Sequence, residues 1–440
     1  MTELQKVTEG KTKTIWQSPD KPGDVIIENK DDITKNDDPS ATETMLNKAV
    51  HATTTTCAVF SLLKEAGIPV AFEQQLSATT FTAPKCKMIP LEVVMRRYAV
   101  GSYLNRYPNL RKKKDETPHR FHRLVCEFFL KTTGGKIKDC DGAHIGNMPN
   151  DCLETEREKP VDDPFISNHL DEVWFLHHPK IPNWDMESYL GVSISQDRIL
   201  PENVTVYKIE ELTRKVFLIL EGAWAKLGFR LIDFKIEFGI DENGNLFVAD
   251  VIDNDSWRLR TSDWQELSKQ CFRDNDSMGE IANKYALVAE LVNKFTCPKQ
   301  AIVFWRGSKD DKLPETHSFT SITIEDIVLS GHKSPSQCLE KLEEILAAYP
   351  GGGVIIPIVG MSNGLGPILS ARTSWPVIAV SAKHGERPHD VWSSLEMPSN
   401  VPMVTVLSPK NAVLAALNIL AQSNPIAYMR RQIEIEELDK

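Results

Sequence analysis

The residues best suited to chemistry lie between positions 230 and 260, in RLIDFKIEFGIDENGNLFVADVIDNDSWRLR. Apolar residues alternate there with charged ones, among them Lys235 and Glu237, which predicts a strand with one apolar and one charged face. Asn243-Gly244 is a strong signal for a tight hairpin turn, and the strand-like run LFVADVID follows it. The stretch therefore predicts a β-hairpin that presents charged side chains on one face.

A two-residue turn at Asn243-Gly244 would set Glu237 directly opposite Asp250. Opposed side chains lie about 4.5–5.5 Å apart at Cβ, and two carboxylates at that separation repel each other unless a cation lies between them. Carboxylate oxygens suit a magnesium ion that also holds substrate phosphates, rather than zinc. The alternative is a solvated charged face, which is the commoner fate of alternating charges. The dense polar cluster that follows, Asp253 to Arg258, favours a ligand.

Two further segments carry groups that bind phosphate. EGKTK, which ends at Lys13, sets Gly10 and Lys11 ahead of a β-type run, so a turn between strands could lay ammonium and N–H groups over a triphosphate. In MIPLEVVMRRYAVGSYL, Arg96-Arg97 and Gly101-Ser102 offer guanidinium groups and a hydroxyl suited to a phosphate monoester. A solvated turn and a solvated arginine pair are the alternatives.

These groups need a scaffold, and the first 296 residues predict a mixed α+β domain. Helices are expected from about Thr44 to Ala66, over KIEELTRKVFLILEGAWAKLG up to Gly228, and from Met278 to about Phe295. The Pro-, Asp- and His-rich segment from about 132 to 202 shows little periodicity and predicts long loops or an insertion.

A second domain is expected over residues 299–440, because Pro298 bars continuation of the preceding helix. Short runs rich in Val and Ile, such as AIVFWRG, GGGVIIPIVG and PVIAV, alternate with helical segments. This alternation is typical of an α/β domain with three layers, in which helices cover both faces of a parallel sheet.

The composition narrows the class of protein. Hydrophobic residues make up 41% and charged residues 25% of the 440, which predicts a compact fold. The net charge of −10 argues against nucleic acid as a partner. No signal peptide and no membrane span are expected, and eight cysteines without a C-x-x-C pair suit a reducing compartment, so we expect a cytoplasmic protein.

Six motifs occur in the order in which phosphoribosylaminoimidazole-succinocarboxamide (SAICAR) synthetases have them. They are EGKTK, MIPLEVVMRRYAVGS, EFFLK, DFKIEFG, ADVIDNDSWRLR and SKQCFRD, and the resemblance covers most of residues 5 to 295. The family uses ATP and Mg²⁺ to join L-aspartate to carboxyaminoimidazole ribonucleotide (CAIR). The domain is thus expected to be an ATP-binding synthetase.

The resemblance also implies residue roles. ATP phosphates are assigned to Lys11 and Lys13, magnesium to Glu237 and Asp250, and the reaction centre to Lys235. The implied substrate-binding residues of this domain are Arg96, Ser102, Arg258 and Lys269.

The segment from Gly360 to Val380, GMSNGLGPILSARTSWPVIAV, resembles a signature of the animal-type aminoimidazole ribonucleotide (AIR) carboxylases, and VWSSLEMPS and TVLSP recur there too. The resemblance covers about residues 299 to 425. It implies carboxylation of AIR with CO₂, without ATP, and proton transfer by His332. It further implies that substrate is bound by Ser308, Lys333, Ser362, Asn363 and Gly364.

Two departures from that family concern the first strand-helix unit of the domain. Gly307 to Asp311 carries Asp310 where the family has a serine beside the substrate phosphate, and no helix is predicted in the KLPETHSFTSITIEDIVLS segment that follows. These changes leave an alternative open, in which the second domain is a non-catalytic oligomerisation scaffold.

The main hypothesis is a bifunctional ligase and lyase of purine biosynthesis, a homo-oligomer assembled through the second domain, with an octamer expected from the resemblance. A regulatory nucleotide-binding protein without turnover is the third hypothesis, and the intact set of Lys11, Lys235, Glu237 and Asp250 disfavours it.

Overall fold

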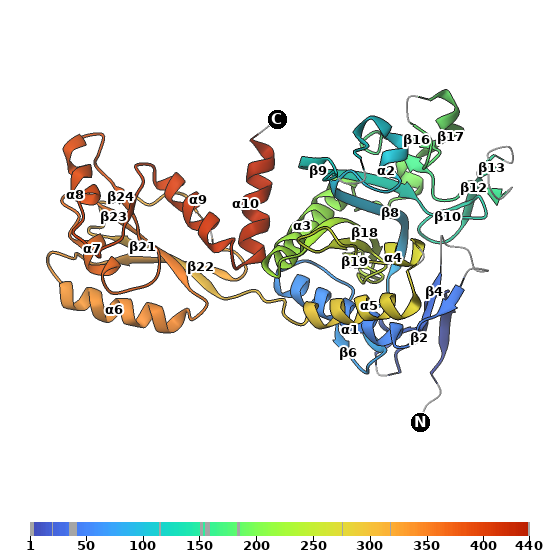
Figure 1. The fold of residues 1–440 in the computed structure, drawn as a ribbon, viewed down its shortest axis with the longest axis horizontal. Coiled ribbons are helices and arrows are strands. Elements are labelled where there is room, and N and C mark those ends of the chain that lie inside the picture. The colour runs from blue at the N-terminus through green and yellow to red at the C-terminus, as the bar shows by residue number, and fades with distance from the viewer. Residues whose placement is uncertain are drawn as a thin grey trace. The chain divides into compact units, whose positions relative to one another are not determined.

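The computed structural model describes residues 4–19, 21–34, 42–113, 116–149, 153–154, 159–182, 185–274, 276–316 and 318–438. The chain divides into two compact units, Met1–Phe295 and Thr296–Lys440, which are coloured blue to yellow and orange to red in Figure 1. The division lies beside Pro298, where the sequence predicts the boundary. Each unit is described by itself.

An eight-stranded sheet forms the centre of the first unit. Its order is β17-β16-β15-β9-β8-β18-β19, and β20 also pairs with β18. The strands are β8 (Lys87–Tyr98), β9 (Arg120–Leu130), β15 (Phe165–Ile166), β16 (Val173–His177), β17 (Tyr189–Ser195), β18 (Arg230–Ile240), β19 (Leu246–Ala249) and β20 (Trp257–Arg260).

Helix α3 (Val206–Lys226) covers the apolar face of this sheet. Its buried Phe217 makes an edge-to-face contact with Phe234 of β18, with ring centroids 5.3 Å apart. Successive residues of a strand point to opposite faces, so Asp233, Lys235 and Glu237 belong to the face that α3 does not cover. We call this the charged face of β18.

A second sheet at the N-terminus supplies further groups to the first unit. Its order is β1-β2-β3-β7-β6. The strands are β1 (Lys6–Glu9), β2 (Lys13–Gln17), β3 (Asp24–Asn29), β6 (Gln74–Gln75) and β7 (Thr80–Pro84); β4 (Asp32–Thr34) pairs with β5 (Thr42–Thr44). The remaining helices of this unit are α1 (Lys48–Glu65), α2 (Tyr103–Arg106), α4 (Gln270–Arg273) and α5 (Met278–Val292).

The three long helices predicted for this unit are confirmed as α1, α3 and α5, and Gly67 and Gly228 follow α1 and α3 with positive φ. The prediction of loops for residues 132–202 is wrong in part. This segment forms β15, β16 and β17 of the central sheet, the small sheet β10 (Thr132–Thr133), β11 (Lys136–Lys138) and β12 (His144–Asn147), and the pair β13 (Leu153–Glu154) and β14 (Lys159–Pro160). Strands this short are stabilised by pairing with distant residues, so local periodicity does not reveal them.

The second unit has a parallel sheet in the order β22-β21-β23-β24-β25. The strands are β21 (Gln300–Arg306), β22 (Ile322–Val328), β23 (Gly353–Val359), β24 (Ile378–Ser381) and β25 (Val404–Thr405). The helices are α6 (Pro335–Ala348), α7 (Leu365–Ser370), α8 (Trp392–Leu395), α9 (Pro409–Leu420) and α10 (Pro425–Glu437).

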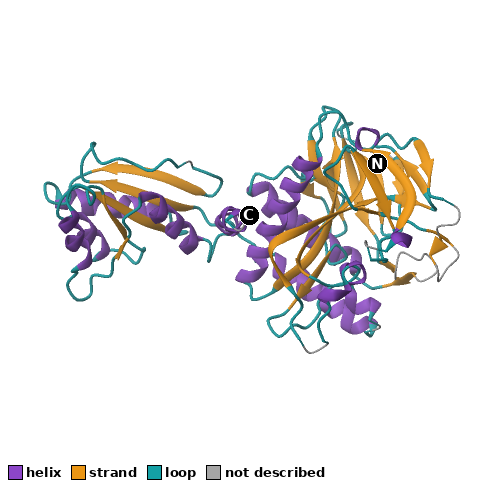
Figure 2. Cartoon of the chain, turned by 90° about the horizontal axis from the view of Figure 1, so that it is seen from above, coloured by secondary structure: helices purple, strands orange, loops and turns teal. Residues whose placement is uncertain are grey.

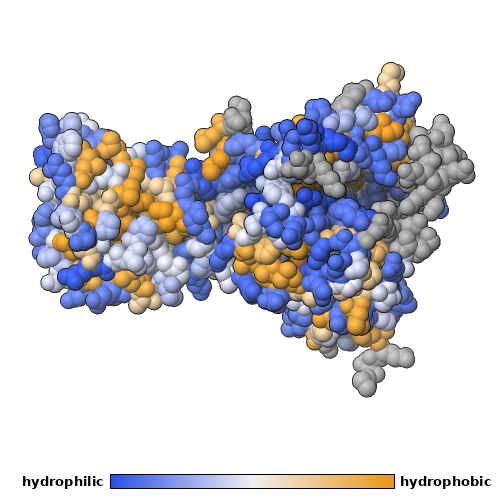
Figure 3. Space-filling model, in the orientation of Figure 1, coloured by the Kyte–Doolittle hydropathy of each residue, from blue (hydrophilic) through white to orange (hydrophobic). Residues whose placement is uncertain are grey.

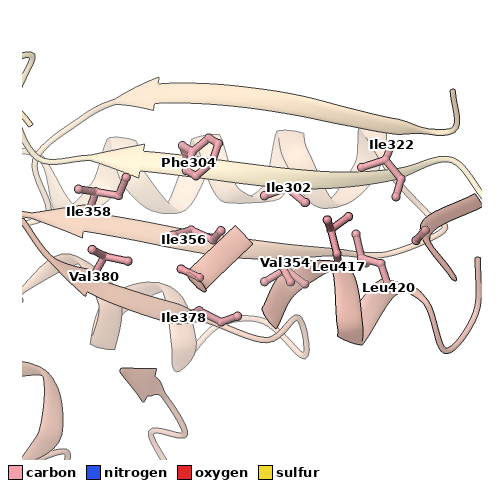
Figure 4. Close-up of a cluster of buried hydrophobic side chains, with 13 residues drawn as sticks. Ile302, Phe304, Ile322, Val354, Ile356, Ile358, Ile378, Val380, Leu417 and Leu420 are labelled. Atoms are coloured by element: carbon pink, nitrogen blue, oxygen red, sulfur yellow. The ribbon is translucent and has the colours of Figure 1, made fainter. Parts of the chain in front are cut away.

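Helices α9 and α6 pack on opposite faces of this sheet, which confirms the predicted α/β class (Figure 1). Figure 2 distinguishes the helices of this unit from its strands by colour. Ile302, Ile356 and neighbouring side chains pack against Leu417 and Leu420 of α9 (Figure 4). On the other face, Trp305 packs in a cluster with Leu342 of α6. The described residues between β21 and β22 form no helix, as the sequence predicted.

Candidate functional site

The hairpin of β18 and β19 differs from the predicted register. Glu237 pairs with Ala249, not with Asp250, because the turn holds one more residue than expected. The amide of Asp241 donates to the carbonyl of Asn245 (3.1 Å), and Gly244, with φ 78°, closes the turn. The prediction that the register alone opposes Glu237 and Asp250 is therefore wrong.

Asp250 nevertheless shares a site with Glu237. A register slip of one residue would turn its side chain to the other face, but Asp250 follows β19 with a φ of 63°, which interrupts the strand alternation. Its carboxylate pairs with the ammonium group of Lys13 from β2. Burial and the neighbouring charge of Asp250 raise the pKa of Glu237, so the two carboxylates are close enough to repel each other.

Lysines lie close to these carboxylates, and their charges act to lower both pKa values. The Nζ atom of Lys131, at the end of β9, lies 2.6 Å from Oε1 of Glu237. Nζ of Lys235 lies 2.7 Å from Oε2 of Glu92, a residue that sequence reasoning did not select. Glu92 is opposed to Glu237 across β8 and β18, and only the sheet pairing reveals this.

The arrangement fits a divalent cation. Burial opposes ionisation of Asp250, but the ammonium of Lys13 lowers its pKa below the ordinary value and keeps it charged. Among the described residues, no group of three or more His, Cys, Asp and Glu is placed to hold a metal. A magnesium ion at Glu237 and Asp250 would therefore need oxygens from bound phosphates or water, which Mg²⁺ commonly uses.

The EGKTK segment forms the predicted turn between strands, here β1 and β2. The amide of Gly10 donates to the carbonyl of Lys13 (2.9 Å). Lys11 is exposed on this turn, whereas Lys13 is partly buried and directed to Asp250. The turn thus brings one of the two predicted phosphate-binding lysines to the carboxylates.

A buried charge network organises the second predicted subsite. Nε of Arg96 lies 2.6 Å from Oε2 of Glu127, and Arg96 also pairs with Asp233. Glu127 pairs in addition with Arg106, and Nη1 of Arg258 lies 2.6 Å from Oδ2 of Asp233. The charges alternate in sign along five residues, so each buried ion has an opposite neighbour.

The predicted arginine ligands differ in their exposure to solvent. The side chain of Arg96 is 4% exposed, against 19% for Arg258, so Arg258 is the more accessible guanidinium. Gly101, with φ 59°, lies so close that a Cβ there would be 2.5 Å from Nη2 of Arg258, which brings Ser102 to the same place. Arg97 is bound by Glu221 instead.

Lys269 lies in another buried cluster, around Asp255. Its Nζ is 3.2 Å from Oδ2 of Asp255, and Nζ of Lys48 is 3.3 Å from the same oxygen. The hydroxyl of Tyr285 donates to Oδ1 (2.5 Å). Sequence reasoning missed Lys48 and Tyr285, which come from α1 and α5. The cluster connects both helices to the loop after β19.

In the second unit, three loops meet at the carboxyl ends of β21, β22 and β23, where parallel sheets commonly bind ligands. His332 lies against the loop of Ser362 and Gly364: a Cβ on Gly364 would be 2.5 Å from its Nε2. A Cβ on Gly331 would be 2.7 Å from the Cα of Leu365. Two glycines therefore allow this close contact.

The other predicted residues of this unit differ in exposure. Asn363 is buried; its Nδ2 donates to Ser394 (3.0 Å) and its Oδ1 accepts from the amide of Gly366 (2.8 Å), so the side chain orders the loop. Ser308 and Lys333 are exposed on their loops.

Two aspartates hold these loops in place. Asp311 is buried and accepts from the amide of Ser308 (3.0 Å). Asp390, which sequence reasoning missed, accepts from the amide of Ser362 (2.6 Å) although it follows a later strand. Asp310 is exposed beside the Ser308 hydroxyl, at 3.5 Å.

Comparison with known protein families matches both units. The SAICAR synthetase family matches residues 6–148 and 191–291, and the AIR carboxylase family matches residues 310–437. The unmatched residues 149–190 lie within the segment for which the sequence predicted long loops or an insertion.

Curated relatives match nearly the whole chain. Multifunctional protein ADE2 of Gallus gallus is 33% identical over 447 residues, covering 97% of this chain and 92% of the relative. The bifunctional phosphoribosylaminoimidazole carboxylase/phosphoribosylaminoimidazole succinocarboxamide synthetase of Homo sapiens is 31% identical, covering 98% and 93%. The phosphoribosylaminoimidazole-succinocarboxamide synthase of Chloroflexus aurantiacus is 34% identical, covering 66% of this chain and 96% of the relative.

The charge network yields a stability prediction. Glu127→Gln leaves Arg96 and Arg106 without their shared carboxylate in the interior, so the free energy of unfolding of the first unit should fall by about 3 kcal/mol. Denaturant unfolding measures this. Glu65→Gln, at the exposed end of α1, is the control and should change the same free energy by no more than about 0.5 kcal/mol. Equal effects of the two substitutions would show that the network contributes nothing to folding.

Proposed function

The chain belongs to the family of bifunctional phosphoribosylaminoimidazole carboxylase/phosphoribosylaminoimidazole succinocarboxamide synthetases, and from this premise we propose that it catalyses two consecutive steps of purine biosynthesis. The second unit carboxylates AIR with CO₂ to give CAIR. The first unit joins L-aspartate to CAIR with ATP. One chain thus makes and consumes the same intermediate.

The observation that carries the synthetase activity is the cluster of Lys13, Lys131, Lys235, Glu237 and Asp250 on and beside the charged face of β18. Mg²⁺ held by Glu237 and Asp250 would neutralise charge on the transferred phosphoryl group. Lys11 and Lys13 bind the phosphates of ATP. Lys13 is drawn from Asp250 toward them, because a polyphosphate carries more negative charge than one carboxylate.

The reaction needs an activated carboxylate. An oxygen of the CAIR carboxylate attacks the γ-phosphorus of ATP, and ADP leaves; the amine of L-aspartate then attacks the acyl carbon, and phosphate leaves. Lys235, held by Glu92, stabilises the negative charge that develops on oxygen. Arg258 and Ser102 hold the ribonucleotide phosphate, while Arg96 acts through Asp233, which it shares with Arg258. Lys269 binds substrate beside Asp255.

The carboxylase activity is supported by the meeting of His332 with the loop of Ser362 and Gly364 at the carboxyl ends of the strands. His332 transfers the proton at the ring carbon that gains CO₂. Ser308 and Lys333 bind the phosphate of AIR, and Lys333 offsets the charge of Asp310. The alternative of a non-catalytic scaffold is not favoured, since the AIR carboxylase family matches residues 310–437.

A homo-oligomer is part of the proposal, with an octamer assembled through the second unit. Apolar side chains gather on the surface of this unit (Figure 3). The exposed large ones include Met361, Trp392, Leu395, Val404 and Leu407. Exposed apolar patches mark interfaces. The described residues contain no helix with the length and apolarity to cross a membrane. We propose a cytoplasmic location because the eight cysteines without a C-x-x-C pair suit a reducing compartment.

The metal assignment predicts the effect of Asp250→Asn. The substitution removes charge but little volume, so ATP-dependent SAICAR formation should fall by about 100-fold or more, with an increased Mg²⁺ requirement, while the fold is kept. Steady-state rates at varied Mg²⁺ and circular dichroism measure both. Glu242→Gln, in the exposed turn of the same hairpin, is the control. Ordinary magnesium dependence in Asp250→Asn would refute the assignment.

The histidine assignment predicts loss of carboxylation in His332→Asn. In an ATP-free assay of AIR with bicarbonate as the CO₂ source, the rate should fall by about 10²- to 10⁴-fold, because the proton at the ring carbon loses its acceptor. SAICAR formation from added CAIR should be unchanged. Carboxylation at the parental rate would place proton transfer on another residue.

The assembly proposal predicts the behaviour of residues 1–296 expressed alone. Light scattering should give fewer subunits per particle than the full chain, because the second unit carries the interface. Equal subunit numbers would contradict assembly through the second unit.

A further inference from the structure

Lys131 has no role in the proposed mechanism beyond its contact with Glu237, although it lies at the reaction centre. Its Nζ is 2.6 Å from Glu237, and its side chain is 41% exposed. After Lys131 the chain departs from the central sheet, and it returns to that sheet more than thirty residues later, at Asp163. The contacts made at this return point suggest what both residues do.

The two ends of the excursion are joined by hydrogen bonds. Asp162 accepts from the hydroxyl of Thr132 (2.8 Å) and from the amides of Gly134 (3.0 Å) and Gly135 (2.9 Å). The amide of Asp163 donates to the Thr132 hydroxyl (3.0 Å), and the Thr132 amide donates to Oδ1 of Asp163 (3.0 Å). Asp163 is therefore fixed beside the residue that follows Lys131.

The backbone at Asp163 supports a functional constraint. Its φ is 50°, a conformation that non-glycine residues seldom adopt and that active sites often contain. Pro164 follows it, and the next residues pair with β9 as strand β15. Oδ2 of Asp163 accepts no hydrogen bond from the residues that the structure describes. A carboxylate oxygen is thus available near enough to Lys131 and Glu92 for their charges to act on it.

We infer that Lys131 and Asp163 form the subsite for the incoming amino acid, in which Lys131 binds a carboxylate of L-aspartate and Asp163 binds its ammonium group and accepts a proton from it. The inference rests on the proposed synthetase activity. An amino dicarboxylate needs a cation for its acidic groups and an anion for its amine, and these two residues supply one of each. Lys131 would then exchange Glu237 for substrate when the metal binds.

The proton balance of the step is complete. Asp163 takes one proton from the ammonium, which leaves a neutral amine with a free electron pair. The amine attacks the acyl carbon of the phosphorylated CAIR, the C–N bond forms and the C–O bond to phosphate breaks. The second proton leaves with the phosphate, and Asp163 returns its proton to water.

The surroundings of Asp163 make it a better base than an ordinary aspartate. Burial raises its pKa to about 6; the Thr132 amide and Lys131 lower it, while Glu92 and Asp162 raise it. The charged groups near it are therefore Glu92 of β8, Lys131 after β9 and Asp162 of its own loop. Because the carboxylate form accepts the proton, the rate with L-aspartate should fall as the pH drops through about 6.

Hydroxylamine separates this subsite from the rest of the reaction. It is nucleophilic as a neutral molecule and has no carboxylate, so it captures the acyl phosphate without Lys131 or Asp163. With CAIR, ATP and Mg²⁺, hydroxamate formation reports phosphoryl transfer alone. The variants are Asp163→Asn, which keeps an acceptor for the Thr132 amide, and Lys131→Gln. Asp197→Asn, exposed in the short helical turn Gln196–Arg198, is the matched control.

We expect both substitutions to impair the reaction with L-aspartate, whereas Asp163→Asn should not impair the reaction with hydroxylamine. Asp163→Asn should lower kcat with L-aspartate by about 100-fold and remove the acidic limb of its pH profile, and Lys131→Gln should raise KM for L-aspartate by about 10-fold. Asp163→Asn should form hydroxamate within about twofold of the control.

Other outcomes overturn the inference. If both variants keep the kcat and KM of the unmodified protein for L-aspartate, the assignment of the subsite is wrong. Parallel loss with both nucleophiles would show that these residues serve folding or phosphoryl transfer. Absence of hydroxamate and of SAICAR in the unmodified protein would instead refute the proposed function.

Discussion

Repulsion between carboxylates on neighbouring strands is the constraint on which the first unit depends. Glu92 and Glu237 are opposed across β8 and β18, and Asp250 turns into the same place. Such a group is compatible with a folded protein only if cations lie between the carboxylates. Lys13 of β2 and Lys131, which follows β9, supply them together with Lys235. In the proposed reaction Lys13 is then in place for the phosphates of ATP, and Lys131 for a carboxylate of L-aspartate.

The arginine network is likewise stabilised by pairing each buried charge with charges of opposite sign. Asp233 and Glu127 are each shared by two guanidinium groups, so Arg96 can be buried while Arg258 remains accessible. In the second unit close backbone approach replaces charge pairing. Gly331 and Gly364 let His332 lie against the loop that follows β23, and any side chain there would separate them. Both sites therefore depend on contacts between segments distant in the sequence.

The excursion between Lys131 and Asp163 shows how an insertion can be accommodated beside a reaction centre. Asp162 holds its two ends together, and β15 to β17 then extend the central sheet. These three strands consequently add to the edge of the sheet beside β9.

The sequence by itself determined the two fold classes, the long helices, the turn that carries Lys11, and the charged face of β18, because these follow from local periodicity and turn chemistry. It did not determine the partners of these residues. Whether the hairpin turn holds two residues or three depends on backbone geometry, so only the tertiary structure showed that Asp250 reaches Glu237 through a left-handed residue rather than through register. Glu92, Lys48, Asp163 and Asp390 were likewise found only from the structure, since a residue's position along the chain does not specify which strand pairs beside it.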